Sequence, residues 1–222
     1  MDNINEQVRK MFDGHWKRQK DKGYVLKPQI EHVSYKNVGF KNGIILDVGC
    51  GNMQYLYYPE PFLENYLVGL DYNEDALTLA RTMLDRINNG FLVCCMGEFL
   101  PFRKYCFDVV LCIDTLSYLK STYLTILENM FEISKKQIIL NVHHEDASYE
   151  KRFKFFDEKE IIQILEDNDF EVKDLHIITA REHYGIDPSK RWPSHLEPPD
   201  TKMYIHIKVE KYDVHTCARD FH

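Results

Sequence analysis

The chain has 222 residues, a length that suits one domain with additions and allows a continuous core. Its hydrophobic share of 44% and charged share of 28% are ordinary for a globular protein. The formal net charge of -7 gives no overall positive field for holding nucleic acid. No apolar run approaches the roughly 18 residues of a membrane span. We therefore expect a cytoplasmic protein with neither a nucleic acid nor a membrane as its partner.

The N-terminal part of the chain predicts an amphipathic helix over residues 2–22 that ends near a glycine. Its apolar positions recur at helical spacing: Ile4, Val8, Met11, Phe12 and Trp16. We interpret residues 1–40 as a helical cap segment and residues 41–222 as the main domain. Residues 181–200 are rich in proline, histidine and charge, and we expect an insertion loop there.

The rest of the chain alternates expected strands with expected helices. Strands are expected at residues 44–48, 66–71, 91–95, 107–113, 137–142, 170–179 and 203–209. Helices are expected at residues 74–88, 123–134 and 157–168. This order predicts an α/β fold with a doubly wound seven-stranded sheet, mostly parallel, whose last strand is antiparallel.

The first two strands end in residues that suit a nucleoside. The first leads into Gly49-Cys50-Gly51, and the second ends at Asp71. Glycines let the backbone approach a ligand closely, and an acid at the next strand end can accept hydrogen bonds from ribose hydroxyls. Both a dinucleotide and S-adenosylmethionine contain such a nucleoside.

Two details favour S-adenosylmethionine over a dinucleotide. Gln54 stands where the dinucleotide fingerprint G-x-G-x-x-G requires its third glycine, and Pro59 and Pro61 interrupt the following helical pattern. Asp47, two residues before the first glycine, would repel a pyrophosphate but suits the cationic amino group of a methionine moiety.

In its motifs and their order, the chain closely resembles the class I S-adenosylmethionine-dependent methyltransferases, which have a Rossmann-like fold. The similar segments are Asp47-x-Gly49-x-Gly51, Asp71, Glu98-Phe99-Leu100-Pro101-Phe102, Phe107-Asp108-Val109-Val110-Leu111-Cys112 and Phe170-Glu171-Val172. The resemblance covers residues 40–180. It implies that Asp47 and the glycine loop hold the methionine part of the cofactor, and that Asp71, with Tyr72 after it, lies at the ribose.

The adenine side departs from the family pattern. The family commonly has an acid or amide at the end of its third strand, but Met96 stands at that place here. We expect Met96 to pack on the adenine face, and the backbone of Gly97 and Glu98 to replace the missing side-chain contact. Asp114, at the end of the fourth strand, completes the expected cofactor-binding set.

The candidates for catalysis are His143, His144 and Asp114. A histidine after the fifth strand could deprotonate a hydroxyl, or the pair could belong to a solvated loop. Asp114 could face the methyl group or an amine substrate, or it could cap the next helical turn. No metal site is expected, because the adjacent side chains of residues 143–146 diverge.

The expected substrate wall is aromatic, with Tyr118, Tyr184 and Trp192 as candidates. We expect methyl transfer to a nitrogen or oxygen atom of a small molecule. Methylation of base amines is disfavoured, because residues 114–118 lack the prolines typical of such enzymes.

The alternatives are an RNA or protein methyltransferase, which a basic rim around residues 17–22 would favour, and a catalytically silent cofactor-binding partner protein. The oligomeric state stays open.

Overall fold

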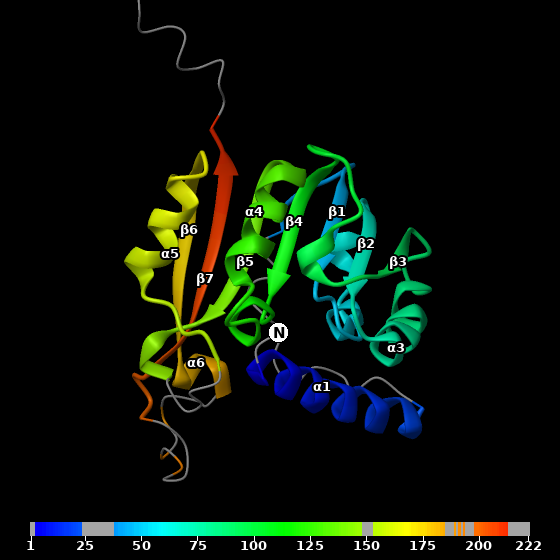
Figure 1. Ribbon diagram of the computed structural model, residues 1–222, viewed down its shortest axis with the longest axis horizontal. Coiled ribbons are helices and arrows are strands. Elements are labelled where there is room, and N and C mark those ends of the chain that lie inside the picture. Colours follow the sequence, from blue (N-terminus) through cyan, green and yellow to red (C-terminus); the bar gives the residue numbers. More distant parts are fainter. Residues whose placement is uncertain are drawn as a thin grey trace, which may run out of the picture.

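The computed structural model describes residues 3–23, 38–147, 153–184, 189, 191, 193 and 198–212. Its strands are β1 (Ile44–Val48), β2 (Tyr66–Asp71), β3 (Gly90–Cys94), β4 (Phe107–Ile113), β5 (Ser134–His143), β6 (Phe170–Thr179) and β7 (Lys202–Lys211). They form one sheet in the order β3-β2-β1-β4-β5-β7-β6 (Figure 1). Strands β1 to β5 are parallel, and β7 is antiparallel to both of its neighbours. The expected doubly wound sheet with an antiparallel last strand is confirmed.

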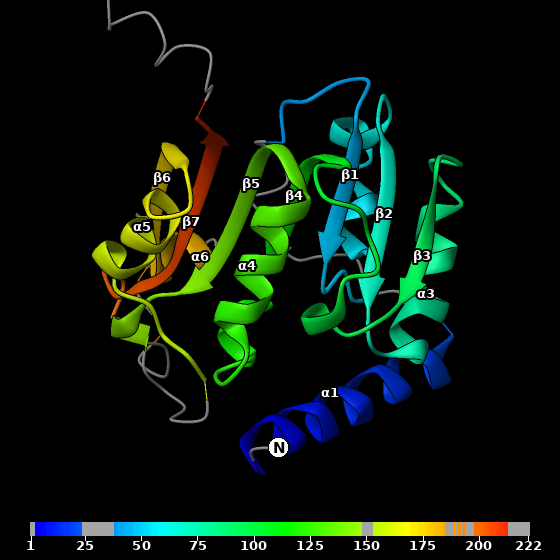
Figure 2. The ribbon, with the colours of Figure 1, turned by 45° about the horizontal axis from the view of Figure 1, so that its top comes forward.

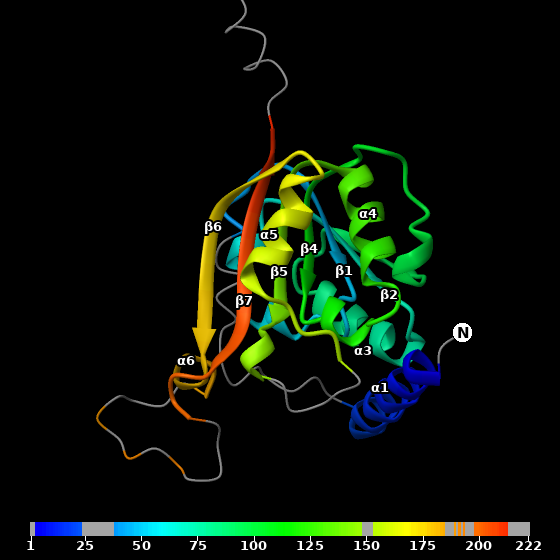
Figure 3. The same cartoon turned by 60° about the vertical axis from the view of Figure 1, so that its left-hand side comes forward.

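Helices lie on both faces of the sheet and across one of its ends. The α-helices are α1 (Asn3–Lys22), α3 (Glu74–Leu84), α4 (Tyr123–Ile133), α5 (Glu158–Glu166) and α6 (Ala180–Tyr184). Short 3-10 helices are η1 (Gln54–Tyr57), η2 (Glu60–Phe62), η3 (Gly97–Phe99), η4 (Leu116–Tyr118) and η5 (Glu145–Ala147). Figures 2 and 3 show α1 crossing beneath the ends of the parallel strands. Among the described residues, no helix is long and apolar enough to cross a membrane.

Two core clusters follow from the alternation of side chains along the strands. Leu46 and Val48 of β1 pack in the cluster that contains the buried faces of α4 and α5. Ile45, which directly precedes Leu46, packs in the cluster that contains the buried face of α3. Because successive strand residues point to opposite faces, a strand that is apolar throughout is buried on both sides.

Some expected element boundaries differ in the structure. The expected insertion loop begins too early, because residues 181–184 belong to α6. The helix expected over 74–88 ends at Leu84, after which tight turns lead to Asn88 with a left-handed φ of 48°. Strand β5 begins at Ser134, directly after α4, and not at residue 137. The division of the chain at residue 40 stays a prediction.

Gly90 is the place where the sheet leaves no room for a side chain. It pairs with Leu67 of β2, and an added Cβ atom would lie 2.0 Å from the Leu67 carbonyl oxygen. We expect Gly90→Ala to lower the free energy of unfolding by about 1–3 kcal/mol, the usual cost of overpacking. Urea denaturation measures the change.

Gly14→Ala in α1 is the matched control. There the added Cβ atom would meet only the end of the Arg18 side chain, at 3.2 Å. Since alanine is a better helix former than glycine, we expect a gain of up to about 1 kcal/mol. Equal stabilities of the two variants would contradict the close approach at Gly90.

Candidate functional site

A cavity of about 720 Å³ lies at the carboxyl ends of β1, β2, β3 and β4. Ligands of doubly wound sheets bind at this edge, where the strand order reverses. Most of the expected site residues line it: Gly49, Cys50, Gly51, Asp71, Tyr72, Met96, Gly97, Glu98, Asp114 and Tyr118. The tertiary structure therefore brings the ends of four expected strands to one wall.

The glycine turn is held against the end of β2. Gly49 and Gly51 have left-handed φ angles of 76° and 52°, which glycine adopts without strain. The amide nitrogens of Gly49 and Cys50 donate hydrogen bonds to the Leu70 carbonyl oxygen, at 2.8 and 3.0 Å. A Cβ atom on Gly49 would lie 2.3 Å from the Thr115 hydroxyl oxygen, so this position has room for glycine alone.

Asp71 connects the turn to the second strand. Its Oδ2 accepts a hydrogen bond from the Gly51 amide at 2.9 Å, and its Oδ1 accepts one from the Asn73 amide at 2.9 Å. Burial raises the pKa of Asp71, while these backbone hydrogen bonds act in the opposite direction. Each oxygen keeps a second lone pair, which a ligand hydroxyl can use.

Asp47 does not line the cavity, although the sequence predicts it on the crevice wall. Its side chain is 1% exposed, and its Oδ2 accepts a hydrogen bond from the Tyr55 hydroxyl at 2.8 Å. Burial raises the pKa of Asp47 to about 7, the Tyr55 hydrogen bond lowers it, and the charge of Asp71 raises it further. Tyr55 itself lines the cavity. Sequence analysis missed Tyr55, since no spacing rule connects it to Asp47.

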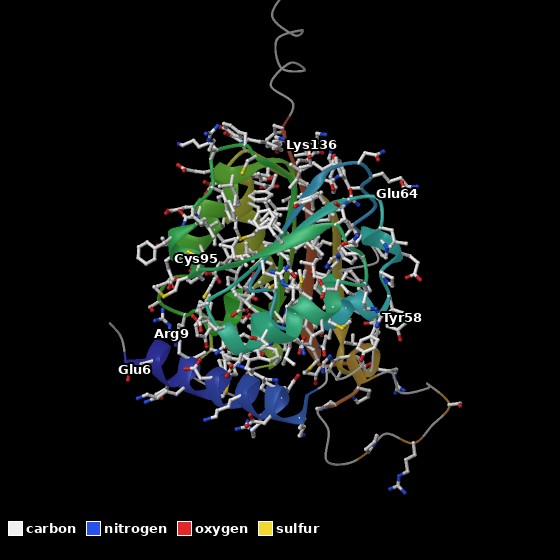
Figure 4. All side chains as sticks on the ribbon, turned by 90° about the vertical axis from the view of Figure 1, so that its right-hand side faces the viewer. Glu6, Arg9, Tyr58, Glu64, Cys95 and Lys136 are labelled. Carbon is white, nitrogen blue, oxygen red and sulfur yellow. The ribbon has the colours of Figure 1, made fainter. Side chains whose placement is uncertain are left out.

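Helix α1 supplies the wall opposite the strand ends. Val8, Arg9, Phe12 and Trp16 line the cavity from one face of this helix. Val8, Phe12 and Trp16, spaced four residues apart, belong to the helical stripe that the sequence predicts. Figure 4 shows Arg9 on the side of α1 that faces the sheet.

Polar contacts hold α1 to the end of β2. The Asp13 carboxylate accepts hydrogen bonds from the Tyr72 hydroxyl at 3.2 Å and from the Asn73 side-chain nitrogen at 2.7 Å. Nη2 of Arg9 lies 3.7 Å from Oε1 of Glu98. The same segment, residues 71–73, thus contacts both the glycine turn and the covering helix.

The two histidine candidates do not line the cavity. His143 and His144 are 1% and 3% exposed, although the sequence favours a loop position open to substrate. The His143 ring packs among Tyr118, at 5.3 Å between ring centroids, and Tyr204, at 5.0 Å, and burial lowers its pKa. Nε2 of His144 lies 3.2 Å from Oε1 of Glu158. Strand β5 continues one residue beyond its expected end and includes His143, and His144 follows it in a bridge with Phe156.

The remaining candidates divide into two groups. Asp114 lines the cavity with a left-handed φ of 54°, and its amide donates a hydrogen bond to the Asn141 carbonyl oxygen at 3.1 Å. Tyr118 also lines the cavity. Tyr184 belongs to α6, but its side chain lies outside the described part of the structure, as does all of Trp192.

Several solved structures share this fold. Magnesium protoporphyrin IX methyltransferase from Synechocystis PCC 6803, solved with bound SAM, is 15% identical, with a TM-score of 0.65 over 96% of this chain and 99% of that one. A candidate methyltransferase in complex with the Haloferax volcanii Trm112 methyltransferase activator is 15% identical, with a TM-score of 0.67 over 96% and 99%. A SAM-dependent methyltransferase from Aquifex aeolicus is 17% identical, with a TM-score of 0.57 over 80% and 87%.

Sequence comparison gives the family. No curated protein sequence matches the chain. The family model described as "Methyltransferase domain" matches residues 40–198, which include β1 to β6, the glycine turn and Asp71. Because this match covers most of the 222 residues, the chain belongs to the methyltransferase domain family.

Proposed function

We propose that this chain transfers a methyl group from S-adenosylmethionine to a nitrogen or oxygen atom of a small molecule. The observation that carries the proposal is the hydrogen bond from the Gly51 amide to Asp71, which unites the glycine turn and the acidic strand end in one cavity wall. Methyl transfer from a sulfonium is an in-line displacement, so the protein must align two reactants and exclude water. A cavity between a rigid sheet end and a covering helix suits both tasks.

The proposal assigns the wall residues to three parts of the cofactor. The backbone of Gly49, Cys50 and Gly51, which lines the cavity, contacts the methionine part. Asp71 accepts hydrogen bonds from the ribose hydroxyls, with Tyr72 beside it. Met96 packs on the adenine, and the segment of Gly97 and Glu98 supplies polar contacts. Asp47 is buried behind the residues that line the cavity, and its negative charge attracts the cationic amino group of the methionine part.

The cavity and its rim support a small acceptor over RNA. In the segment of α1 that was expected to form a basic rim, Lys20 forms an ion pair with Asp75 at 2.5 Å. The hollow beside Lys17 is lined by Asp13, Glu74 and Asp75. These acids beside Lys17 and Lys20 interrupt the continuous positive surface that phosphate backbones require. A cytoplasmic location stays a prediction.

Calorimetry with S-adenosylmethionine tests the proposed cofactor directly. We expect binding with a dissociation constant between about 1 μM and 1 mM, the range in which enzymes hold their substrates. The demethylated product S-adenosylhomocysteine should compete for the same site. An absence of binding at millimolar concentration would contradict the proposed function.

Replacing Asp71 by alanine tests the ribose contact. We expect Asp71→Ala to weaken the binding of S-adenosylmethionine by about 1–3 kcal/mol, because polar partners are left unpaired. Asp85→Ala, which changes an exposed aspartate at the end of α3, should leave the affinity unchanged. Circular dichroism checks that both variants fold. An unchanged affinity in the Asp71 variant would exclude this residue from the site.

The pH dependence of binding tests the role of Asp47. Because the pKa of Asp47 in the free protein is about 7, part of the population carries a proton at neutral pH. A nearby cation favours the ionised carboxylate, so the pKa falls on binding and a proton is released. Affinity for S-adenosylmethionine should therefore be highest above pH 7 and fall by up to about tenfold per pH unit below it.

Two controls isolate this effect. Asp47→Asn removes the titrating group, so the slope below pH 7 should become shallower. 5′-Methylthioadenosine lacks the amino acid part, and its affinity should vary less with pH in the unchanged protein. A slope that is the same in Asp47→Asn would assign the titration to another group, of which Asp71 is the nearest candidate.

A further inference from the structure

Trp16 of α1 lies directly against the glycine turn. An added Cβ atom on Gly51 would lie 3.0 Å from Cζ2 and 3.1 Å from Cη2 of the indole. These two adjacent atoms form one edge of the six-membered ring, which therefore occupies the space that a side chain at position 51 would take. Since Trp16 also lines the cavity, the indole forms part of the cavity wall at this turn.

Contacts on both sides of Trp16 hold the indole at this place. The next turn of α1 is joined to the residue after Gly51, because the side-chain nitrogen of Asn52 donates a hydrogen bond to Oε1 of Gln19 at 3.0 Å. Nε2 of Gln19 lies 2.7 Å from Nε2 of His15. The His15 ring in turn meets the indole edge to face, with ring centroids 4.6 Å apart. The helix and the glycine turn thus fix the position of the ring together.

Under the proposed function, on which this inference rests, the sulfur atom of the cofactor lies beside Trp16. The sulfur joins the methionine chain, which is assigned to the glycine turn, to the ribose, which is assigned to Asp71. The amide of Gly51 and the carboxylate of Asp71 are hydrogen-bonded at 2.9 Å. A ligand that makes both contacts has its sulfur next to Gly51, where the indole lies.

Two buried carboxylates at the turn favour a positively charged ligand. Asp47 and Asp71 are both buried, and the hydrogen bonds that they accept come from uncharged donors, a phenol and backbone amides. Burial raises the pKa of each acid, and the charge of Asp71 raises that of Asp47 further. A cation bound between them and Trp16 reduces this repulsion.

We propose that Trp16 binds the sulfonium of S-adenosylmethionine and strengthens the binding of the methyl donor relative to its product. An indole attracts a cation more strongly than the rings of phenylalanine and tyrosine do. Methyl transfer leaves the electron pair of the carbon–sulfur bond on sulfur and so removes the positive charge. The product S-adenosylhomocysteine is a neutral thioether at this place, and it loses the attraction to Trp16, which favours its release.

Three ligands of similar shape separate charge from packing: S-adenosylmethionine, S-adenosylhomocysteine and sinefungin. In sinefungin, a carbon bearing an ammonium group replaces the methylated sulfur. Each is titrated by calorimetry against the full chain and against Trp16→Leu. We expect Trp16→Leu to weaken the two cationic ligands by about two- to thirtyfold more than S-adenosylhomocysteine, the range of a cation–π contact.

Two outcomes would overturn the proposal. Equal changes for all three ligands, including no change at all, would make Trp16 a packing residue. A loss confined to S-adenosylmethionine would assign the contact to its methyl group and not to its charge.

Two further variants guard against a folding defect. Trp16→Phe keeps a ring that attracts cations less strongly, so we expect it to fold and to lower the ratio of S-adenosylmethionine affinity to S-adenosylhomocysteine affinity by less than Trp16→Leu does. Phe12→Leu removes an aromatic ring one turn earlier, where α1 meets Tyr118, and should leave this ratio unchanged. An equal fall of the ratio in the Phe12 variant would contradict a role specific to Trp16.

Titration of the unchanged protein separates the two proposals. If neither S-adenosylmethionine nor S-adenosylhomocysteine binds, the proposed function fails. If both bind and the Trp16 variants leave their affinity ratio unchanged, the proposed function stands and only the role of Trp16 is rejected.

Discussion

The hydrogen bond from the Gly51 amide to the Asp71 carboxylate is the contact on which the site depends. It crosses from the turn after β1 to the end of β2, and the Leu70 carbonyl oxygen adds bonds from the Gly49 and Cys50 amides. Withdrawing a carboxylate from water is costly, as the raised pKa of Asp71 indicates. Backbone amides offset part of this cost and bring the acid to the cavity wall.

The residues after Asp71 extend this network to the covering helix. Tyr72 and Asn73 both donate hydrogen bonds to Asp13, some 60 positions earlier in the sequence. The cavity is therefore shaped jointly by the sheet end and by α1, whose Phe12 and Trp16 line it. A change in the position of α1 would alter the aromatic wall at Tyr118 and the ion pair at Glu98 together.

Local pattern was sufficient for most of the fold. The bounds of β1, β2 and β4 agree with the expected ones, because apolar runs between turn residues are typical of strands buried on both faces. Those of β6 agree as well, although this strand lies at the edge of the sheet and is mostly not buried. Element ends were less predictable. Capping and turn bonds end α3 at Leu84, although its apolar stripe continues to Ile87. Tyr55 was missed because its contact with Asp47 depends on how the chain after the glycine turn folds back.

Sequence alone determined the sheet, the glycine turn and the acid that follows it, since these depend on periodicity, on backbone freedom and on spacing along neighbouring strands. The tertiary structure decided which polar side chains reach the cavity. It buried Asp47, His143 and His144, and it exposed Asp114 and Tyr118 to the cavity. The physical reason is that a side chain's access depends on the segments packed against it, here α1, η1 and β7, and no local spacing encodes that packing.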